Sequence, residues 1–422
     1  MIVIGAGPAG IAAALEAEKN GLNDIVILER DKYIGGILPQ CIHNGFGLEY
    51  FGEELTGPEY AYEFIKDLNN SNIEVLTETM VLDVNDKKEI TALNKEKGVI
   101  KVKGETIVLA MGCRERTREN IKIPGDRPSG ILSAGTAQRY TNIEGYMPGK
   151  EVVILGSGDI GLIMARRMRL EGADVKAVLE IMPFSSGLVR NKVQCLDDFD
   201  IPLKLQHTIT RIEGKERLKR VKVAQVDEYF NPIEDTEEWI ECDTLLLSVG
   251  LIPENELTKA MGLDLHPVTG GTYVNENRET NIEGVYAAGN VLHVHDLVDW
   301  VSEEAEIAGK AAADYLNEKL EKREQKIKIT PGENVTYTVP QTIEYTFQDK
   351  KFIKVFMRVT KPMEDVKVKF IYDNQEIVSY PKKIVMPGEM VTANLPAALI
   401  KNDMDEIKVS IEKKVGENDG KK

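Results

Sequence analysis

Two glycine-rich turns in this chain have the residue types and spacing that hold a dinucleotide. They read Gly5-Ala-Gly-Pro-Ala-Gly10 and Gly156-Ser-Gly-Asp-Ile-Gly161, and each stands between an apolar run and a helix-like stretch. In such a turn the first glycine makes the bend, the second lets the backbone approach a pyrophosphate, and the third lets the helix pack on the strand. The N–H groups at the start of the helix then face the phosphates. One such turn alone is weak evidence, but two in the same context predict two bound dinucleotides.

An acidic residue follows each turn at the distance expected for a ribose ligand. Glu29 and Glu180 each end a second apolar run, where a carboxylate can accept hydrogen bonds from the ribose hydroxyls. A carboxylate at Glu180 would repel the 2′-phosphate of NADP, so we expect NADH in preference to NADPH at the second turn. Arg190 would weaken this preference if its loop folded back over the site.

The elements around these turns predict an α/β fold with two Rossmann-like domains, followed by an all-β domain. The first turn lies between strands, with a helix that ends near Gly21, and the second is followed by a helix through Leu170. After about Gln325, short strand-like runs predict a small β-sandwich. The predicted strands are residues 2–4, 24–29, 151–155, 175–180, 335–339, 352–359 and 366–371, and residues 317–328, rich in Lys and Glu, are predicted as an exposed helix end and a linker.

Composition restricts the classes of protein to which the chain can belong. With 42% hydrophobic and 29% charged residues over 422 positions, it is typical of a globular protein. The net charge of -16 argues against non-specific binding to nucleic acid or to an anionic bilayer. Four cysteines without metal-ligand spacing indicate a reducing cytoplasm, and we expect no export signal and no membrane span. Only Met1 precedes the first strand, so we expect either a start upstream or a fold that tolerates a short strand.

Two further segments complete a resemblance to a known family. They are Thr106-Ile-Val-Leu-Ala-Met-Gly112 and Thr280-Asn-Ile-Glu-Gly-Val-Tyr-Ala-Ala-Gly-Asn290. Together with the two turns, they make the chain resemble the FAD-dependent pyridine nucleotide-disulfide oxidoreductases over about residues 1 to 320. The resemblance implies FAD at the Gly5 turn, NADH at the Gly156 turn, and an NAD domain inserted in the FAD domain. The implied boundaries are 1–113 and 281–324 for the FAD domain, 114–280 for the NAD domain and 325–422 for the C-terminal sandwich.

The family's second FAD signature normally ends in Gly-Asp, whereas this chain has Gly289-Asn290. An asparagine keeps an acceptor oxygen and adds a donor, so we expect FAD binding to persist. The stretch from Trp300 to Gly309 resembles the helix whose N-terminus faces the flavin, where its dipole would stabilise reduced flavin.

The residues implied to contact FAD are Gly5, Gly7, Pro8, Ala9, Gly10, Glu29, Arg30, Gly36, Ile37, Cys41, His43, Asn44, Ala110, Gly112, Gly289, Asn290, Asp299, Trp300 and Val301. Those implied to hold NAD are Gly156, Gly158, Asp159, Ile160, Gly161 and Glu180.

The segments 35–47 and 289–296 resemble a subgroup associated with glycerol-3-phosphate dehydrogenase-like proteins and, more distantly, subunits of sarcosine oxidase and hydrogen cyanide synthase. This resemblance implies electron transfer between NADH and a partner subunit, either a second flavoprotein or a cysteine-rich, iron-sulfur protein. The C-terminal sandwich would then serve as a partner or dimer contact. A non-catalytic, flavin-bearing assembly subunit is the alternative.

Cys41 and His43 are the candidate catalytic residues. Only one cysteine follows Gly35-Gly36, and no CxxC is present, so we do not expect a redox disulfide. Cys41 could be a lone redox thiol whose thiolate is favoured by His43, as in a stand-alone NADH oxidase or peroxide reductase. The favoured alternative is that Cys41 packs beside the flavin while His43 or Asn44 hydrogen-bonds it.

The remaining chemistry-bearing residues have less specific patterns. His293, His295 and Asp296 could ligate a metal, but without further ligands we expect a flavin or domain contact and no metal. Asp299, Glu303 and Glu304 are expected on the N-terminal face of a helix. Cys113, Cys195 and Cys242 are expected to be buried or inert.

Overall fold

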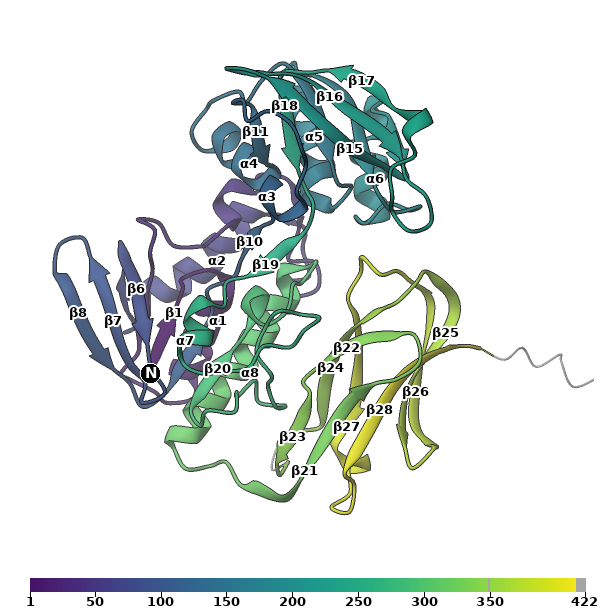
Figure 1. Ribbon diagram of the computed structural model, residues 1–422. Coiled ribbons are helices and arrows are strands. Elements are labelled where there is room, and N and C mark those ends of the chain that lie inside the picture. Colours follow the sequence, from purple (N-terminus) through teal and green to yellow (C-terminus); the bar gives the residue numbers. More distant parts are fainter. Residues whose placement is uncertain (348–349, 415–422) are drawn as a thin grey trace, which may run out of the picture. The chain divides into compact units, whose positions relative to one another are not determined.

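The structure is a computed structural model and describes residues 1–347 and 350–414. The chain forms two compact units. The first consists of residues 1–38, 44–113 and the part from 253 onward, and the second of residues 39–43 and 114–252. Figure 1 labels their elements. Among the residues so described, no helix is both long and apolar enough to cross a bilayer.

A five-stranded parallel sheet is the core of the first unit, in the order β20-β9-β1-β2-β5. Its central strands are short and buried, because helices α1, α2 and α8 cover one face of the sheet, while strands β6 and β7 and part of the C-terminal sandwich cover the other. Helices α1 and α8 pack backbone to backbone, since a Cβ on Gly309 would lie 2.1 Å from the Ala13 carbonyl oxygen. The elements are β1 Ile2–Ile4, α1 Pro8–Lys19, β2 Val26–Leu28, α2 Gly57–Asn69, β5 Glu74–Leu76, β9 Ile107–Leu109, α7 Glu256–Ala260, β20 Val285–Ala287 and α8 Val298–Leu316. A three-stranded antiparallel sheet adds β6 Thr79–Val84, β7 Glu89–Asn94 and β8 Gly98–Lys103.

The second unit repeats the parallel design. Its five-stranded sheet has the order β11-β18-β12-β13-β14, and a three-stranded antiparallel sheet has the order β15-β16-β17. The elements are α3 Arg118–Ile121, β11 Ile131–Ser133, α4 Ala134–Asn142, β12 Glu151–Leu155, α5 Asp159–Leu170, β13 Asp174–Glu180, α6 Val189–Cys195, β14 Leu203–Leu205, β15 His207–Gly214, β16 Leu218–Gln225, β17 Glu238–Glu241 and β18 Thr244–Leu247.

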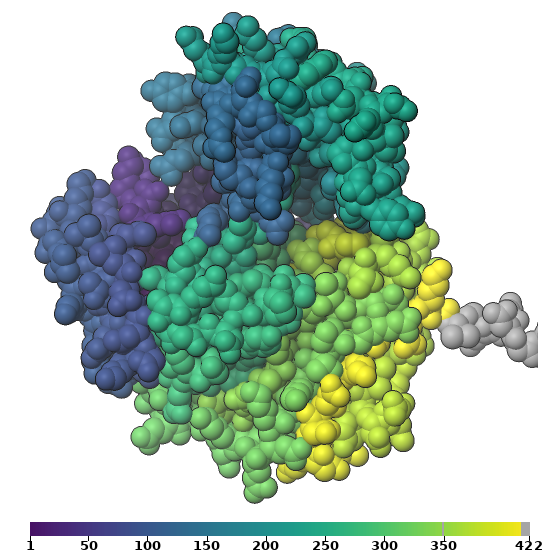
Figure 2. All heavy atoms as spheres, in the orientation of Figure 1, coloured from purple at the N-terminus to yellow at the C-terminus, as the bar shows by residue number. Residues whose placement is uncertain are grey.

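The C-terminal part of the first unit is a sandwich of two sheets, β23-β21-β28-β25-β26 and β22-β24-β27. Strand β24 presents Ile353, Val355 and Met357 to the sandwich core, whereas Phe356 joins a core shared with the parallel sheet. In Figure 2 the sandwich and the teal-green segment that precedes α8 form one continuous surface. The strands are β21 Lys322–Pro331, β22 Val335–Val339, β23 Thr342–Tyr345, β24 Phe352–Val359, β25 Met363–Tyr372, β26 Gln375–Val385, β27 Val391–Pro396 and β28 Glu406–Lys413.

The predicted fold class is confirmed, while one predicted segment is wrong. Residues 317–328 are not a helix end and linker, because α8 ends at Leu316 and β21 begins at Lys322. In β21, Ile327 and Ile329 are buried between exposed or half-buried charged residues, so this strand has the composition of a solvated segment. The predicted domain boundaries stay predictions.

Candidate cofactor-binding sites

The first glycine turn has the shape of a phosphate cradle. Gly5 has a φ of +106°, and a Cβ there would lie 2.5 Å from the Ala110 carbonyl oxygen. A Cβ on Gly10 would lie 1.8 Å from the Gly5 carbonyl oxygen. Gly7 differs, because its Cβ would meet nothing of the protein nearer than the Gly36 Cα at 3.8 Å. Gly5 and Gly10 are thus required by packing, whereas the open space at Gly7 fits an external ligand such as a pyrophosphate.

Glu29 lies at the end of β2 beside this cradle. Its buried carboxylate accepts hydrogen bonds from the Ala6 N–H at 2.7 Å and the Asp31 N–H at 2.8 Å. A carboxylate can accept about four hydrogen bonds, so acceptor capacity remains for ribose hydroxyls. The structure thus gives Glu29 the geometry expected of the ribose ligand.

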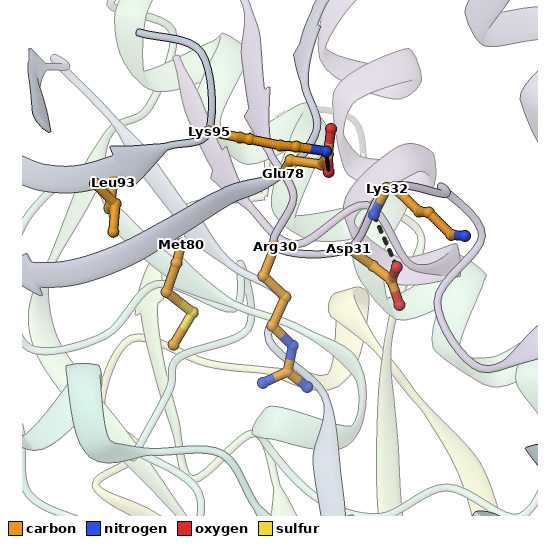
Figure 3. A pocket seen from close by; sticks show the side chains of 7 residues that line it. All are labelled: Arg30, Asp31, Lys32, Glu78, Met80, Leu93 and Lys95. Carbon is orange, nitrogen blue, oxygen red and sulfur yellow. Dashed lines mark hydrogen bonds and ion pairs between the residues drawn. The ribbon is translucent and has the colours of Figure 1, made fainter. Parts of the chain in front are cut away.

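A hollow of about 600 Å³ opens beside Arg30, the residue that follows Glu29 in the chain. The Glu29 carbonyl oxygen accepts a hydrogen bond from the Thr79 N–H at 2.7 Å. This bond joins the end of β2 to the start of β6, the strand that carries Met80. In Figure 3 the side chains of Arg30, Met80 and Leu93 project into the same space. An apolar surface beside a guanidinium suits a planar base, and an adenine would fit here. The lining residues are Arg30, Asp31, Lys32, Glu78, Met80, Leu93 and Lys95.

Gly289 brings three of the predicted FAD segments together. It has a φ of +75°, and a Cβ on it would lie 2.9 Å from the Ala9 Cβ and 3.1 Å from the Val301 Cγ1. The first cradle, the second signature and the start of α8 therefore meet at one point. This is the arrangement that a bound flavin nucleotide requires of these segments.

Asn290 uses both ends of its amide. Its Oδ1 accepts a hydrogen bond from the His295 N–H at 2.9 Å, and its Nδ2 donates to the half-buried Cys113 Sγ at 3.5 Å. A carboxylate could not make the second bond. The asparagine in place of the family's aspartate is therefore matched by its neighbours, which sequence patterns alone do not reveal.

Asp299, in the first turn of α8, holds a loop. Its carboxylate accepts the N–H groups of Gly47 at 2.9 Å, Glu49 at 2.8 Å and Tyr50 at 3.2 Å. Asp299 therefore positions residues 47–50, and its predicted contact with FAD stays a prediction. Next to it, the Trp300 ring lies 4.3 Å from the Lys354 Nζ of the sandwich.

The second glycine turn repeats the first. Gly156 has a φ of +99°, and a Cβ there would lie 2.0 Å from the Ser248 carbonyl oxygen. A Cβ on Gly161 would lie 2.6 Å from the Gly156 carbonyl oxygen, whereas at Gly158 the nearest atom would be the Ser248 Oγ at 3.4 Å. Ser248 takes the place that Ala110 has at the first cradle. The second site therefore fits a dinucleotide on the same grounds.

Glu180 lies at the end of β13 as Glu29 lies at the end of β2, but its carboxylate already accepts four hydrogen bonds within the chain, which leaves little capacity for ribose hydroxyls. Its buried carboxylate accepts the Ser157 N–H at 3.0 Å, the Ser186 hydroxyl at 3.1 Å and the Met182 N–H at 3.0 Å. The Ser157 hydroxyl donates to it as well, at 2.5 Å. Sequence patterns did not single out either serine, because a serine inside a glycine-rich turn carries no specific signal.

Asp159, at the first position of α5, binds the segment that follows Glu180. Its Oδ1 accepts the Leu188 N–H at 2.8 Å and the Asn191 side-chain amide at 2.7 Å. A carboxylate is favoured at a helix N-terminus by the helix dipole. The side chain of this predicted NAD residue therefore positions the segment 188–191 beside the cradle.

Cys41 belongs to the second unit together with residues 39–43. Its Sγ lies 3.7 Å from the Gln138 Oε1, which also accepts a hydrogen bond from Gln40 at 3.0 Å. Burial raises the pKa of the Cys41 thiol to about 12. Cys41 is half-buried, but because the thiolate is the nucleophile in cysteine chemistry, the raised pKa argues against Cys41 as a redox thiol. All four cysteines are free.

Glu304, which the sequence placed on the N-terminal face of a helix, is the seventh residue of α8 and is wholly buried. It lies well inside α8, where Arg278, His293 and His295 surround it. The two histidine rings pack against Phe356 of the sandwich, and Asp296 accepts a hydrogen bond from the Met390 N–H. The expected domain contact of His293, His295 and Asp296 is thus confirmed.

Comparison with known proteins gives a consistent result. A family described as pyridine nucleotide-disulphide oxidoreductase matches residues 1–312. Hydrogen cyanide synthase subunit HcnB of Pseudomonas protegens is 26% identical over 284 residues, which are 62% of this chain and 59% of that protein. An NADH oxidase of Methanocaldococcus jannaschii is 26% identical over 311 residues, 70% of this chain and 64% of that protein.

The chain thus matches less than two thirds of the length of either curated relative. Among solved structures, the thioredoxin reductase of T. acidophilum has a TM-score of 0.62 at 22% identity, covering 75% of this chain and 98% of that one. At this identity the likeness shows the fold alone.

Proposed function

The chain belongs to the pyridine nucleotide-disulphide oxidoreductase family, and on that premise we propose that it exchanges a hydride between NADH and FAD and passes electrons to or from a partner subunit. The family is FAD-dependent and uses pyridine nucleotides. The observation that carries the proposal is the pair of matched cradles. In each, a buried carboxylate accepts the N–H of the residue after the first glycine, from Ala6 to Glu29 and from Ser157 to Glu180.

FAD would supply a hydride acceptor, and the chain's own residues would bind and orient it. Gly7 leaves room for the pyrophosphate, and Glu29 has acceptor capacity for the ribose. Gly289 and Val301 place the second signature against α8. The N–H groups at the start of α8 favour negative charge on the reduced cofactor.

We propose NADH as the nucleotide at the second cradle. Glu180 is buried, and N–H and hydroxyl donors surround its side-chain oxygens. A second negative group, such as a 2′-phosphate, would be repelled there. The named NADH oxidase among the relatives supports the same choice.

A partner subunit is proposed because the four cysteines are separate free thiols and no disulfide is available to carry electrons onward. One relative is itself named as a subunit. A glycerol-3-phosphate dehydrogenase-type complex is one such assembly, proposed on the resemblance of residues 35–47 and 289–296. Purifying the native complex and identifying the co-eluting chains would test this part.

The stand-alone oxidase or peroxide reductase that uses Cys41 is disfavoured by the burial that keeps this thiol protonated. The non-catalytic alternative is disfavoured by Gly158, because a Cβ there would fit against Ser248 and a cradle without a ligand would not need a glycine at this position.

Anaerobic mixing of the FAD-loaded protein with NADH tests the proposal. We expect the visible absorbance of oxidised flavin to bleach with NADH and to bleach much more slowly with NADPH. Dithionite serves as the control that the flavin is reducible. Flavin that dithionite bleaches and NADH does not would contradict the proposed function.

A further inference from the structure

A buried cluster surrounds Glu304 in the first unit. Its Oε1 accepts hydrogen bonds from Arg278 Nε at 2.9 Å and His293 Nε2 at 3.1 Å. Its Oε2 accepts from His295 Nε2 at 3.0 Å and from the Gly289 N–H at 3.0 Å. The side chains of Glu304, Arg278 and His295 have no exposed surface, and that of His293 has 1%.

The geometry fits an ion pair better than a metal site. The ligand atoms of His293, His295 and Glu304 lie within 4.8 Å of one another, which is close enough for a cation. However, Arg278 already holds its positive charge against one oxygen of the same carboxylate. A divalent cation there would face a buried guanidinium without an added negative charge to balance it.

The cluster is costly, which favours a role beyond packing. His293 Nδ1, His295 Nδ1 and Arg278 Nη1 are buried and have no hydrogen-bond partner within the described part of the chain. Buried ion pairs are often no more stable than an apolar replacement of the same shape. Unsatisfied buried atoms cost further stability.

Two of its bonds reach the loop of the second FAD signature. The Gly289 N–H is held by Glu304, and the His295 N–H holds the Asn290 side chain. Gly289 in turn touches the first cradle at Ala9. Moving Glu304 would therefore move the loop that lies against the proposed FAD site.

The other side of the cluster is formed by the sandwich. The Phe356 ring lies 5.6 Å from the Arg278 guanidinium, and it packs edge-to-face on His293 at 5.5 Å and His295 at 5.4 Å. The neighbouring outward residue Arg358 bonds the Val294 carbonyl oxygen at 3.1 Å. The outward face of β24 is thus bound to the segment between Gly289 and α8.

We propose that Glu304 is a positioning residue for FAD, and that the C-terminal sandwich, through Phe356, is part of the flavin-binding apparatus. This inference rests on the FAD half of the proposed function and is independent of NADH. It predicts that damage to the outward face of β24 weakens FAD binding, whereas damage to its inward face does not.

The test compares variants of the full chain. FAD is removed, and the dissociation constant for added FAD is measured from the quenching of its fluorescence, together with the visible spectrum of the bound flavin and the urea midpoint. The variants are Glu304→Ala and Phe356→Leu. The control is Met357→Ala, which lies on the same strand but faces the sandwich core.

We expect Glu304→Ala to raise the FAD dissociation constant about tenfold or more and to shift the flavin spectrum, and Phe356→Leu to raise the constant about threefold. Met357→Ala should lower the urea midpoint and leave the FAD dissociation constant within about twofold. If Glu304→Ala does not fold, the comparison of Phe356→Leu with Met357→Ala decides.

Equal effects of the outward and inward substitutions on the FAD dissociation constant would overturn the inference. This outcome is distinct from a failure of the proposed function. In that case the wild-type protein would bind FAD and not be bleached by NADH, while the variant constants would still separate as expected.

Discussion

A buried carboxylate that accepts a backbone N–H recurs at three ligand loops. Glu29 holds Ala6, Glu180 holds Ser157, and Glu304 holds Gly289. Each of these hydrogen bonds ties a side chain to the backbone of a loop at a proposed cofactor site. The first two carboxylates were predictable from their spacing after the glycines, but the third was not. Glu304 lies within a helix that contains other acidic residues, and only the fold shows that it is buried.

We expect that neither peroxide turnover nor the reduction of flavin by NADH depends on a thiolate at Cys41. With a pKa of about 12, the thiol stays protonated throughout the neutral range. Cys41→Ser should therefore leave peroxide turnover and NADH bleaching within about twofold of the wild type, and iodoacetamide should label Cys41 slowly at neutral pH. Peroxide turnover lost in Cys41→Ser would revive the redox-thiol hypothesis.

We expect the acceptor oxygen and the donor amide of Asn290 to contribute separately to FAD affinity. Asn290→Asp keeps the acceptor for the His295 N–H and loses the donor to Cys113, so FAD affinity should fall by about threefold or less. Asn290→Leu loses both the acceptor and the donor, so its FAD affinity should fall by about tenfold or more. The ratio of flavin absorbance to protein absorbance after purification measures both. A larger loss with Asp than with Leu would contradict this account of the asparagine.

One pair of substitutions can test separately the nucleotide proposed for each cradle. A Cβ on Gly7 or Gly158 would make only ordinary van der Waals contacts within the protein, with nearest atoms at 3.8 Å and 3.4 Å. A methyl group at either position should therefore be tolerated by the fold and obstruct only the pyrophosphate. Gly7→Ala should lower FAD content about tenfold, whereas Gly158→Ala should keep FAD and abolish most bleaching by NADH.

Each variant is the control for the other, and both should keep the wild-type urea midpoint to within experimental error. Gly158→Ala that loses FAD, or Gly7→Ala that unfolds, would show that the space is needed by the protein itself.

At the scale of single strands and helices, the local pattern of apolar and turn residues predicted much of the fold. The runs 2–4, 151–155, 335–339 and 352–359 coincide with strands because each is apolar and ends at turn residues. Pattern did not predict strand β21, whose exposed Lys and Glu mimic a linker. Nor did it predict Met80 and Leu93 beside Glu29, since these positions meet only when the three-stranded sheet forms.

Over the whole first unit, the sandwich and the parallel-sheet domain share a hydrophobic core. Tyr337, Val339 and Phe356 of the sandwich join that core, while Ile353 and Val355 belong to a separate one inside the sandwich. Successive side chains of β24 point to opposite faces, so one face packs in the sandwich core and the other in the core shared with the parallel sheet. The sequence pattern indicated a strand here, but it could not indicate which of its faces meets another domain.

This shared core predicts how stability depends on pH. Burial lowers the pKa of His293 to about 4, against about 6.5 for an unfolded histidine. Between these two values the unfolded chain binds more protons than the folded chain, so stability falls as pH falls through this window. From pH 7 to pH 5, His293 alone should lower the free energy of unfolding by about 2 kcal/mol.

The charged and titratable groups that face His293 are Glu304, Arg278, His295 and the more distant Tyr337. Urea unfolding at both pH values measures the effect. His293→Leu should remove most of this acid-dependent loss, even if it changes stability at pH 7, because the difference between the two pH values isolates proton binding. Met357→Ala, which removes no titratable group, is the control and should keep the wild-type slope. An unchanged slope in His293→Leu would mean that His293 does not resist protonation in the folded protein, and that the core shared with the sandwich admits a charge.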